Sequence, residues 1–320
     1  MIKFATNILF ATDFSESAGP AFCHSLEWAT GLDASLTLVN VQSIQLGIDV
    51  DASVSQRFLD EQRERAKTQL DRLLTETRRQ VPSAAAQHLT GMPYEQICQI
   101  ARDKHCDLII MGTHGWSGID RVLFGSVAER VIAHAPCPVL SIPLRKAEDI
   151  AAMHTLSPIP RHIILPLDFS ECSLEAYEFA VQIAKWFDSA LTLVYAIEPL
   201  TYSLDFTLTH PLQDKANRKK MQDRLVELTE VLIKEGMTAE YEILEKPAME
   251  ATLETSTTRQ ADLIVMGTHG RKGLSKFVMG SITGKVLRHS PYPVLTVKSP
   301  KFEGGHYPRP DSEQTANVKE

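Results

Sequence analysis

The chain has 320 residues, of which 43% are hydrophobic and 23% charged, and its mean hydropathy is −0.12. This composition is typical of globular proteins and excludes disordered and collagen-like chains, and the length predicts about two domains. The net charge of −7 argues against nucleic acid and anionic membrane surfaces as partners, whereas small polyanions can still bind to backbone amides.

Local patterns exclude two further classes of protein. No apolar run approaches the ~20 residues of a membrane-spanning helix, and the N-terminal segment lacks the design of a signal peptide. The five cysteines include no Cys-x-x-Cys pair, so neither a disulfide framework nor a zinc site is expected. These features predict a cytoplasmic protein with reduced thiols and no membrane partner.

The predicted elements of the first half alternate between strands and helices. An apolar run at 7–11 is typical of a buried strand, and Ser15 is expected to cap the helix that follows. A β-branched run at 36–41 predicts a second strand, and leucines at helical spacing predict a long helix at about 55–80. The later elements are a strand at about 84–90, a helix at 94–104, a strand at 107–111, a helix from Ser126 and a strand at 139–142.

The second half predicts the same elements in the same order. Its first strand is expected at 163–167, and Ser170 is expected to cap the next helix. Strands that alternate with helices predict a parallel sheet covered on both faces. The later elements are strands at 191–196, about 239–244, 262–266 and 294–297, and helices at about 211–235, at 249–259 and from Ser281.

The two halves are related by duplication, because motifs recur 155 residues apart. Between 107–142 and 262–297, 17 of 36 residues are identical in register. We therefore predict two tandem doubly wound α/β domains, Rossmann-like or flavodoxin-like, each with a five-stranded parallel sheet. The predicted boundaries are a first domain at 1–145, a linker at 146–160, a second domain at 161–299 and a disordered tail at 300–320.

A ligand site is predicted where the strand order of each sheet reverses, beyond the carboxyl ends of the strands. In each half an Asp follows the first strand, and a Gly-x2-Gly-x9-Gly-Ser pattern runs from the fourth strand into the last helix. Glycines let backbone amides approach a phosphate, and a helix N-terminus adds amides and the positive end of its dipole. The pattern comprises Gly112, Gly115, Gly125 and Ser126 in the first half and Gly267, Gly270, Gly280 and Ser281 in the second.

Simpler structural roles remain open for these residues. The glycines could form a tight strand-to-helix turn alone, and Asp13 and Asp168 could cap the turn that follows them. His114 and His269, each between a motif's two glycines, are more simply loop residues or spacers than catalytic bases. We therefore expect no catalytic residue and no metal ligand among these motifs.

The duplicated motifs resemble those of the universal stress protein family, in its tandem two-domain form. The resemblance covers about 1–145 and 161–298 and includes Thr12-Asp13-Phe14-Ser15, Leu167-Asp168-Phe169-Ser170, both glycine motifs and the Pro-x-Pro-Val segments. It implies a five-stranded parallel fold that binds ATP, with or without Mg²⁺, and halves that pair through their last strands as an intramolecular pseudo-dimer. Further pairing into a homodimer, and the identity of a protein partner, are left open.

The resemblance also implies which residues line each nucleotide site. The first set is Asp13, Val41, Met111, Gly112, Gly115, Gly125 and Ser126, and the second is Pro166, Asp168, Ala196, Met266, Gly267, Gly270, Gly280, Ser281 and Thr283.

The function expected from this resemblance is a cytosolic stress-response protein that binds an adenine nucleotide and acts by ligand-dependent regulation or partner contact. The alternatives are a slow ATP hydrolase, a scaffold with vestigial pockets and, least favoured, a flavin protein. The chain has no Gly-x4-Gly-Lys-Ser/Thr loop and no acid–base pair that would activate a water, which disfavours the hydrolase.

The two halves differ in ways that predict unequal affinity. The second half carries Arg271, Lys272 and Lys276 in its glycine loop, whereas the first carries Asp120 and Arg121. The last helix of the second half also begins Ser-Ile-Thr, whereas that of the first begins Ser-Val-Ala and lacks one hydroxyl. We therefore predict tighter nucleotide binding in the second half.

Overall fold

The computed structural model of the chain describes residues 4–43, 52–113, 124–144, 157–198, 211–270 and 279–299. The chain divides into two compact units, the first formed mainly by Met1–Leu144 and the second by Arg145–Val297. Most of the predicted linker and all of the predicted tail lie outside the described residues. In the described part of the chain, no helix is long and apolar enough to cross a bilayer.

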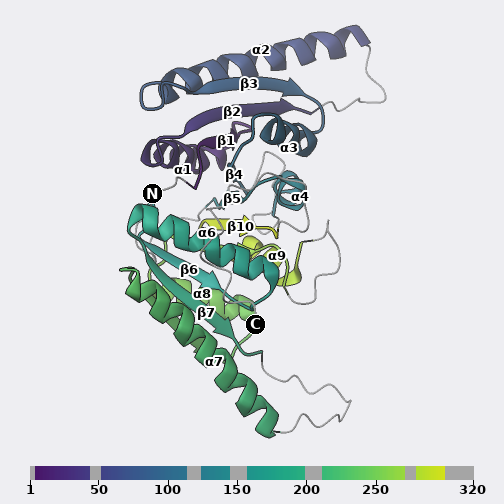
Figure 1. The fold of residues 1–320 in the computed structure, drawn as a ribbon. Helices are drawn as coiled ribbons and strands as arrows, with labels where there is room; N and C mark the ends of the chain where they lie inside the picture. The colour runs from purple at the N-terminus through teal and green to yellow at the C-terminus, as the bar shows by residue number, and fades with distance from the viewer. Residues whose placement is uncertain are drawn as a thin grey trace. The chain divides into compact units, whose positions relative to one another are not determined.

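The first unit contains a parallel five-stranded sheet with the strand order β3-β2-β1-β4-β5 (Figure 1). The chain therefore adds strands in one direction up to β3 and then returns to the other side of β1. In sequence order its elements are β1 Asn7–Ala11, α1 Ala18–Gly31, β2 Ser35–Gln42, α2 Ala52–Thr77, β3 Ala85–Thr90, α3 Pro93–Asp103, β4 Leu108–Gly112, α4 Ser126–His134 and β5 Val139–Ile142.

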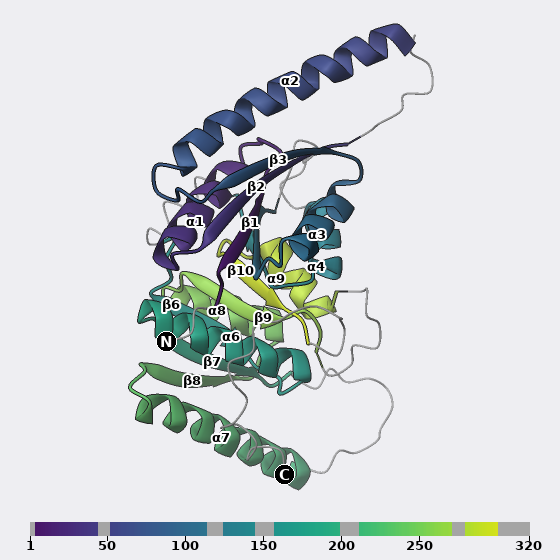
Figure 2. The same ribbon diagram turned by 45° about the horizontal axis from the view of Figure 1, so that its top comes forward.

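The second unit repeats this topology, with the strand order β10-β9-β6-β7-β8 and parallel pairing throughout (Figure 2). The predicted fold class, two tandem doubly wound domains, is therefore confirmed. Its elements are β6 His162–Pro166, α6 Glu171–Phe187, β7 Ala190–Ala196, α7 Pro211–Lys234, β8 Ala239–Leu244, α8 Ala248–Thr258, β9 Leu263–Gly267, α9 Ser281–His289 and β10 Val294–Val297.

Helices cover both faces of each sheet. Right-handed crossovers place the first two helices of a unit on one face and the last two on the other. In the first unit α3 packs against α4, and α2 runs along the edge strand β3 (Figure 2). In the second unit α8 packs against α9, and α7 runs along β8 (Figure 2). This arrangement explains why the inner strands are apolar without alternation.

The central strands form the core of each unit. In the first unit Leu9, Phe10 and Ile110 have no exposed surface. Ile164 and Val265 of the second unit are equally buried. Burial of such side chains stabilises a fold by roughly 1.5–3 kcal/mol each. The buried strands thereby support the crest of each sheet, the edge formed by the carboxyl ends of the strands.

One predicted helix start is wrong. Ser15 does not cap the first helix, because α1 begins at Ala18 and Ser17 occupies the N-cap position. The backbone amide and the hydroxyl of Ser15 instead donate to Asp13 Oδ1, at 2.9 and 2.5 Å. In the second unit the prediction is confirmed, since Ser170 Oγ accepts a hydrogen bond from the amide of Ser173 at 3.3 Å.

Candidate functional site

A strained turn follows the first strand of each unit. Phe14 and Phe169 have φ values of 61° and 59°, a left-handed conformation that bulky residues rarely adopt. The turn is held by the preceding Asp, because Asp168 Oδ1 accepts a hydrogen bond from the amide of Ser170 at 2.9 Å, as Asp13 does from Ser15. Both aspartates therefore cap the turn that follows them, which is one of the simpler roles left open above. In each, Oδ1 is the oxygen that accepts the hydrogen bond from the serine amide.

The first glycine of each motif serves helix–sheet packing. A Cβ on Gly267 would lie 2.7 Å from the carbonyl carbon of Cys172 in α6, and one on Gly112 would lie 2.8 Å from the backbone oxygen of Ser17. Backbone atoms cannot move aside cheaply, so these positions require glycine for the close approach of a helix. Helix–sheet packing, and not ligand binding, thus accounts for the first glycine of each motif.

The later glycines of the second unit surround the Asp168 carboxylate and the start of α9. A Cβ on Gly270 would lie 2.8 Å from Asp168 Oδ2, so this glycine leaves space for the carboxylate. The amide of Gly280 donates to the carbonyl of Thr268 at 2.9 Å and closes the loop. Gly125 makes the matching bond to Thr113 at 2.7 Å. The last glycine of each motif therefore positions the helix that follows.

The N-terminus of α9 lies at this end of the sheet, beside the later glycines. In an α-helix the first-turn amides have no acceptor within the helix, and they lie at the positive end of the dipole. The Gly280 N-cap has no side chain to satisfy the amides that follow it. The Thr283 hydroxyl donates to the carbonyl of Gly267 at 2.8 Å and anchors α9 to the end of β9. Ala128, at the matching position of α4, cannot make this bond.

A cavity of about 740 Å³ opens at the carboxyl ends of β6, β7 and β9. This volume lies within the usual range of small-molecule sites, roughly 300–1,000 Å³. All nine residues predicted for the second site line it, although the sequence placed them on separate strands, loops and a helix. The complete lining is Pro166, Leu167, Asp168, Ser173, Val194, Tyr195, Ala196, Ile197, Glu198, Ala248, Thr252, Met266, Gly267, His269, Gly270, Gly280, Ser281, Ile282, Thr283 and Lys285.

Sequence reasoning missed several lining residues. Lys285 could have been found from helical periodicity, because it lies four residues after Ser281 and so on the same side of α9. Glu198 lies two residues after the end of β7, so the topology alone places it near the carboxyl ends of the strands. His269 is 93% buried, not exposed, and its Nδ1 lies 3.0 Å from Thr268 Oγ1.

In the first unit the predicted residues occupy the matching positions of the sheet. Asp13 follows β1, Val41 lies near the end of β2, and Met111 and Gly112 end β4. Gly125 is the N-cap of α4 and Ser126 its first residue. Gly115 and His114 lie outside the described residues, as do the loop residues 116–121 and 271–276 on which unequal affinity was predicted.

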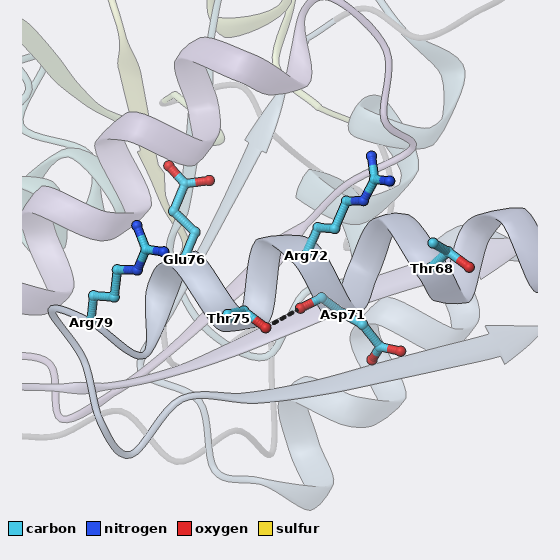
Figure 3. A pocket seen from close by; sticks show the side chains of 6 residues that line it. All are labelled: Thr68, Asp71, Arg72, Thr75, Glu76 and Arg79. Atoms are coloured by element: carbon cyan, nitrogen blue, oxygen red, sulfur yellow. Dashed lines mark hydrogen bonds between the residues drawn. The ribbon is translucent and has the colours of Figure 1, made fainter.

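A second hollow lies on the surface of α2 in the first unit (Figure 3). It is lined by Thr68, Asp71, Arg72, Thr75 and Glu76 of α2 and by Arg79 in the turn that follows the helix. Its acidic and basic side chains balance in number, and Thr75 Oγ1 is bonded to the carbonyl of Asp71 at 2.8 Å. We assign no function to this hollow.

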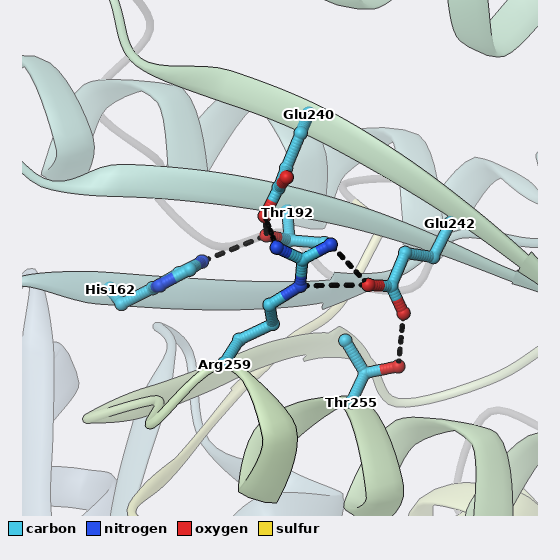
Figure 4. A network of polar contacts seen from close by, with 6 residues as sticks. All are labelled: His162, Thr192, Glu240, Glu242, Thr255 and Arg259. Atoms are coloured by element: carbon cyan, nitrogen blue, oxygen red, sulfur yellow. Dashed lines mark hydrogen bonds and ion pairs between the residues drawn. The ribbon is translucent and has the colours of Figure 1, made fainter.

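A polar network links the end of α8 to β6, β7 and β8 (Figure 4). Arg259 follows α8 and binds Glu240 at 3.0 Å and Glu242 at 2.6 Å. His162 Nε2 lies 2.8 Å from Thr192 Oγ1, whose hydroxyl donates to Glu240 Oε1 at 3.0 Å. Burial lowers the pKa of His162 from its ordinary value of 6.5. The network therefore fastens α8, whose other end lines the cavity.

The described residues contain no cluster of three His, Cys, Asp or Glu side chains that could hold a metal ion. The doubly wound parallel sheets, with a glycine-lined crest at the point of strand reversal, define a flavodoxin-like α/β protein. Both halves match the model of the Universal stress protein family, over residues 5–143 and 160–298. The chain belongs to this family and has its tandem two-domain form.

Two relatives found by sequence each match a little less than half of this chain. Universal stress protein MJ0531 of Methanocaldococcus jannaschii is 32% identical over 144 residues, which are 45% of this chain and 85% of that protein. Universal stress protein MJ0577 of the same organism is 31% identical over 150 residues, 42% and 93% of the two chains. A universal stress protein structure from Archaeoglobus fulgidus covers 92% of this chain and 96% of its own with a TM-score of 0.67 and 22% identity, which shows a shared fold.

Proposed function

We propose that the second unit binds ATP, with or without Mg²⁺, in the cavity between Asp168 and the start of α9. The observation that carries this proposal is the convergence of nine residues of the ATP-binding pattern on one cavity of about 740 Å³. The amides of the first turn of α9 would receive phosphate oxygens, and Gly270 permits a close approach of the backbone. Asp168 would accept a hydrogen bond from the ribose or the base.

Binding, not turnover, is the proposed activity. The chain would act as a stress-response protein whose partner contacts depend on the bound nucleotide. The nucleotide would be held by backbone amides and dipoles, which need no charged groups to be brought into the cavity. We also propose a cytoplasmic location, which the five free cysteines support.

Isothermal titration of the purified full chain with ATP tests the proposal, in Mg²⁺ and in EDTA. We expect saturable binding, with about tenfold weaker binding by D168N, because asparagine keeps the turn but loses one acceptor. D13N is the matched control and should leave the tighter binding phase unchanged. If the full chain binds no ATP, or steady ADP release accompanies binding, the proposed activity is wrong; the first result would favour a scaffold and the second a slow hydrolase.

The first unit is proposed as the weaker site. Its α4 lacks the Thr283 anchor, since Ala128 stands at the matching position. We further propose, from the family resemblance, that the two units of one chain pair as a pseudo-dimer. Sedimentation of the full chain across a concentration series would show whether a further homodimer forms.

A further inference from the structure

The acidic side chains of the cavity disfavour an anionic ligand unless a basic side chain also contacts that ligand. Among the described lining residues, the charged ones are Asp168, Glu198 and Lys285. Two carboxylates facing one cavity would repel a phosphate group. Lys285 is thus the cation that the described part of the lining offers to a ligand.

The position of Lys285 suits contact with a ligand that begins at the helix N-terminus. Lys285 lies one turn after Ser281, and residues four apart share one side of a helix. Thr252 of α8 lines the same cavity, and α8 packs beside α9. The side chain of Lys285 therefore adds a charge beyond the amides of the first turn, on the side of the cavity next to α8.

The ammonium group of Lys285 has no ion-pair partner among the described residues. Other lysines of this unit do: Lys185 binds Glu235 at 2.6 Å, and Lys246 binds Glu254. Lys285 is exposed where it lines the cavity, so its flexible stem can reorient toward a ligand.

The first unit provides an internal comparison. Arg130 occupies the matching position of α4, and its guanidinium carbon lies 5.2 Å from the centre of the Tyr94 ring. A cation over an aromatic face is held by the ring's quadrupole. The position that matches Tyr94 in the second unit is Met249, which offers no such face. The cation at this helix position is therefore engaged in packing in the first unit and faces the cavity in the second.

We infer that Lys285 is a phosphate-binding residue of the second unit and makes its site prefer nucleotides with more phosphate groups. The inference rests on the proposed nucleotide binding and adds to it a residue outside the glycine motif. A lysine ammonium acts on phosphate as a point charge, so its contribution should grow with the charge of the ligand.

Titrations of the full chain and its variants with adenosine, AMP, ADP and ATP test this role. K285Q should weaken ATP binding about tenfold and leave adenosine binding within about twofold, whereas K285R should retain most of the ATP affinity. R130Q is the matched control at the same position of the first unit, and neither the tighter ATP phase nor adenosine binding should change in it.

A residue-specific measurement separates the two sites. Acetylation of Lys285 by a limiting acylating reagent, followed by peptide mass spectrometry, should slow severalfold in ATP and not in adenosine, while acetylation of Lys234 stays constant. Equal losses of ATP and adenosine affinity in K285Q, or no change in ATP affinity and no protection, would overturn the inference while wild-type binding stands. If the wild-type chain binds none of the four ligands, the inference falls together with the proposed function.

Discussion

The glycines of a single motif are required for different physical reasons, and substitutions can distinguish these reasons. In G267A the new Cβ would meet the backbone of Cys172 at 2.7 Å, so α6 must shift away from β9. We expect a loss of about 1–3 kcal/mol in the free energy of unfolding, as overpacked cores show. Urea unfolding of the full chain, followed by circular dichroism, measures it.

In G270A the new Cβ would meet Asp168 Oδ2 at 2.8 Å, at the end of a side chain. The carboxylate can turn aside, so stability should change by less than about 0.5 kcal/mol. The displaced carboxylate should instead weaken ATP binding severalfold in a titration. Large destabilisation by G270A together with normal binding would contradict the separation of roles.

His162 gives the second unit a dependence of stability on pH. Burial lowers its pKa in the folded state below 6.5, although Glu240 and Asp262 oppose the shift and Arg259 supports it through its charge. As the pH falls through about 6.5, the unfolded chain takes up a proton before the folded chain does, so stability is lost on acidification. The contribution of His162 is constant above that range.

H162N tests this linkage, because Asn7 stands at the matching position of the first unit. We expect the loss of stability between pH 8 and pH 5.5 to be smaller in H162N than in the parent chain. The measured quantity is the difference between the two urea midpoints, so a uniform destabilisation by the variant cancels. An unchanged difference would mean that other histidines account for the acid sensitivity.

At the scale of elements, the network around Arg259 distinguishes two otherwise matching helices. Arg259 joins the end of α8 to Glu240 and Glu242 of β8. In the first unit Lys104 stands at the position of Arg259, and Ala85 and Gln87 stand at the positions of the two glutamates and offer no carboxylate. Exposed ion pairs contribute about 0.2–1 kcal/mol, and Arg259 holds two carboxylates while its side chain is 36% exposed. R259A should therefore cost about 1 kcal/mol, and K104A should cost less.

Thermal unfolding at low and high salt measures this difference between R259A and K104A. The cost of R259A should shrink as salt screens the ion pairs. A cost that is equal for the two variants, or independent of salt, would mean that packing of the arginine stem accounts for it.

Most elements could be predicted from the sequence because the pattern of each element occurs twice, once in each duplicated half. The strands at 139–142 and 294–297 were predicted to the residue, since apolar and β-branched runs bounded by turn residues leave little choice. The start of α1 was wrong because the Ser15 side chain is engaged by Asp13, a competition that residue preferences do not contain. The packing role of Gly267 was also unpredictable, because it depends on how closely α6 approaches β9.

At the scale of the whole molecule, duplication followed by divergence predicts two sites of unequal strength. The second unit has the Thr283 anchor and a lysine facing its cavity, whereas the first has Ala128 and an arginine held by Tyr94. A ligand that binds only the folded state stabilises it by an amount that grows with the ratio of ligand concentration to Kd. At ATP concentrations between the two dissociation constants, the stabilisation should therefore be confined to the second unit.

Hydrogen exchange followed by mass spectrometry tests this expectation without separating the units. Peptides that cover 263–289 should gain protection at ATP concentrations that leave peptides covering 108–134 unchanged, and D168N should abolish the first effect. Because the two segments are equivalent by duplication, each serves as the internal standard for the other. Equal protection at every ATP concentration, or earlier protection of 108–134, would reverse the assignment of the stronger site, and the Thr283 anchor and the lysine charge would then not determine affinity.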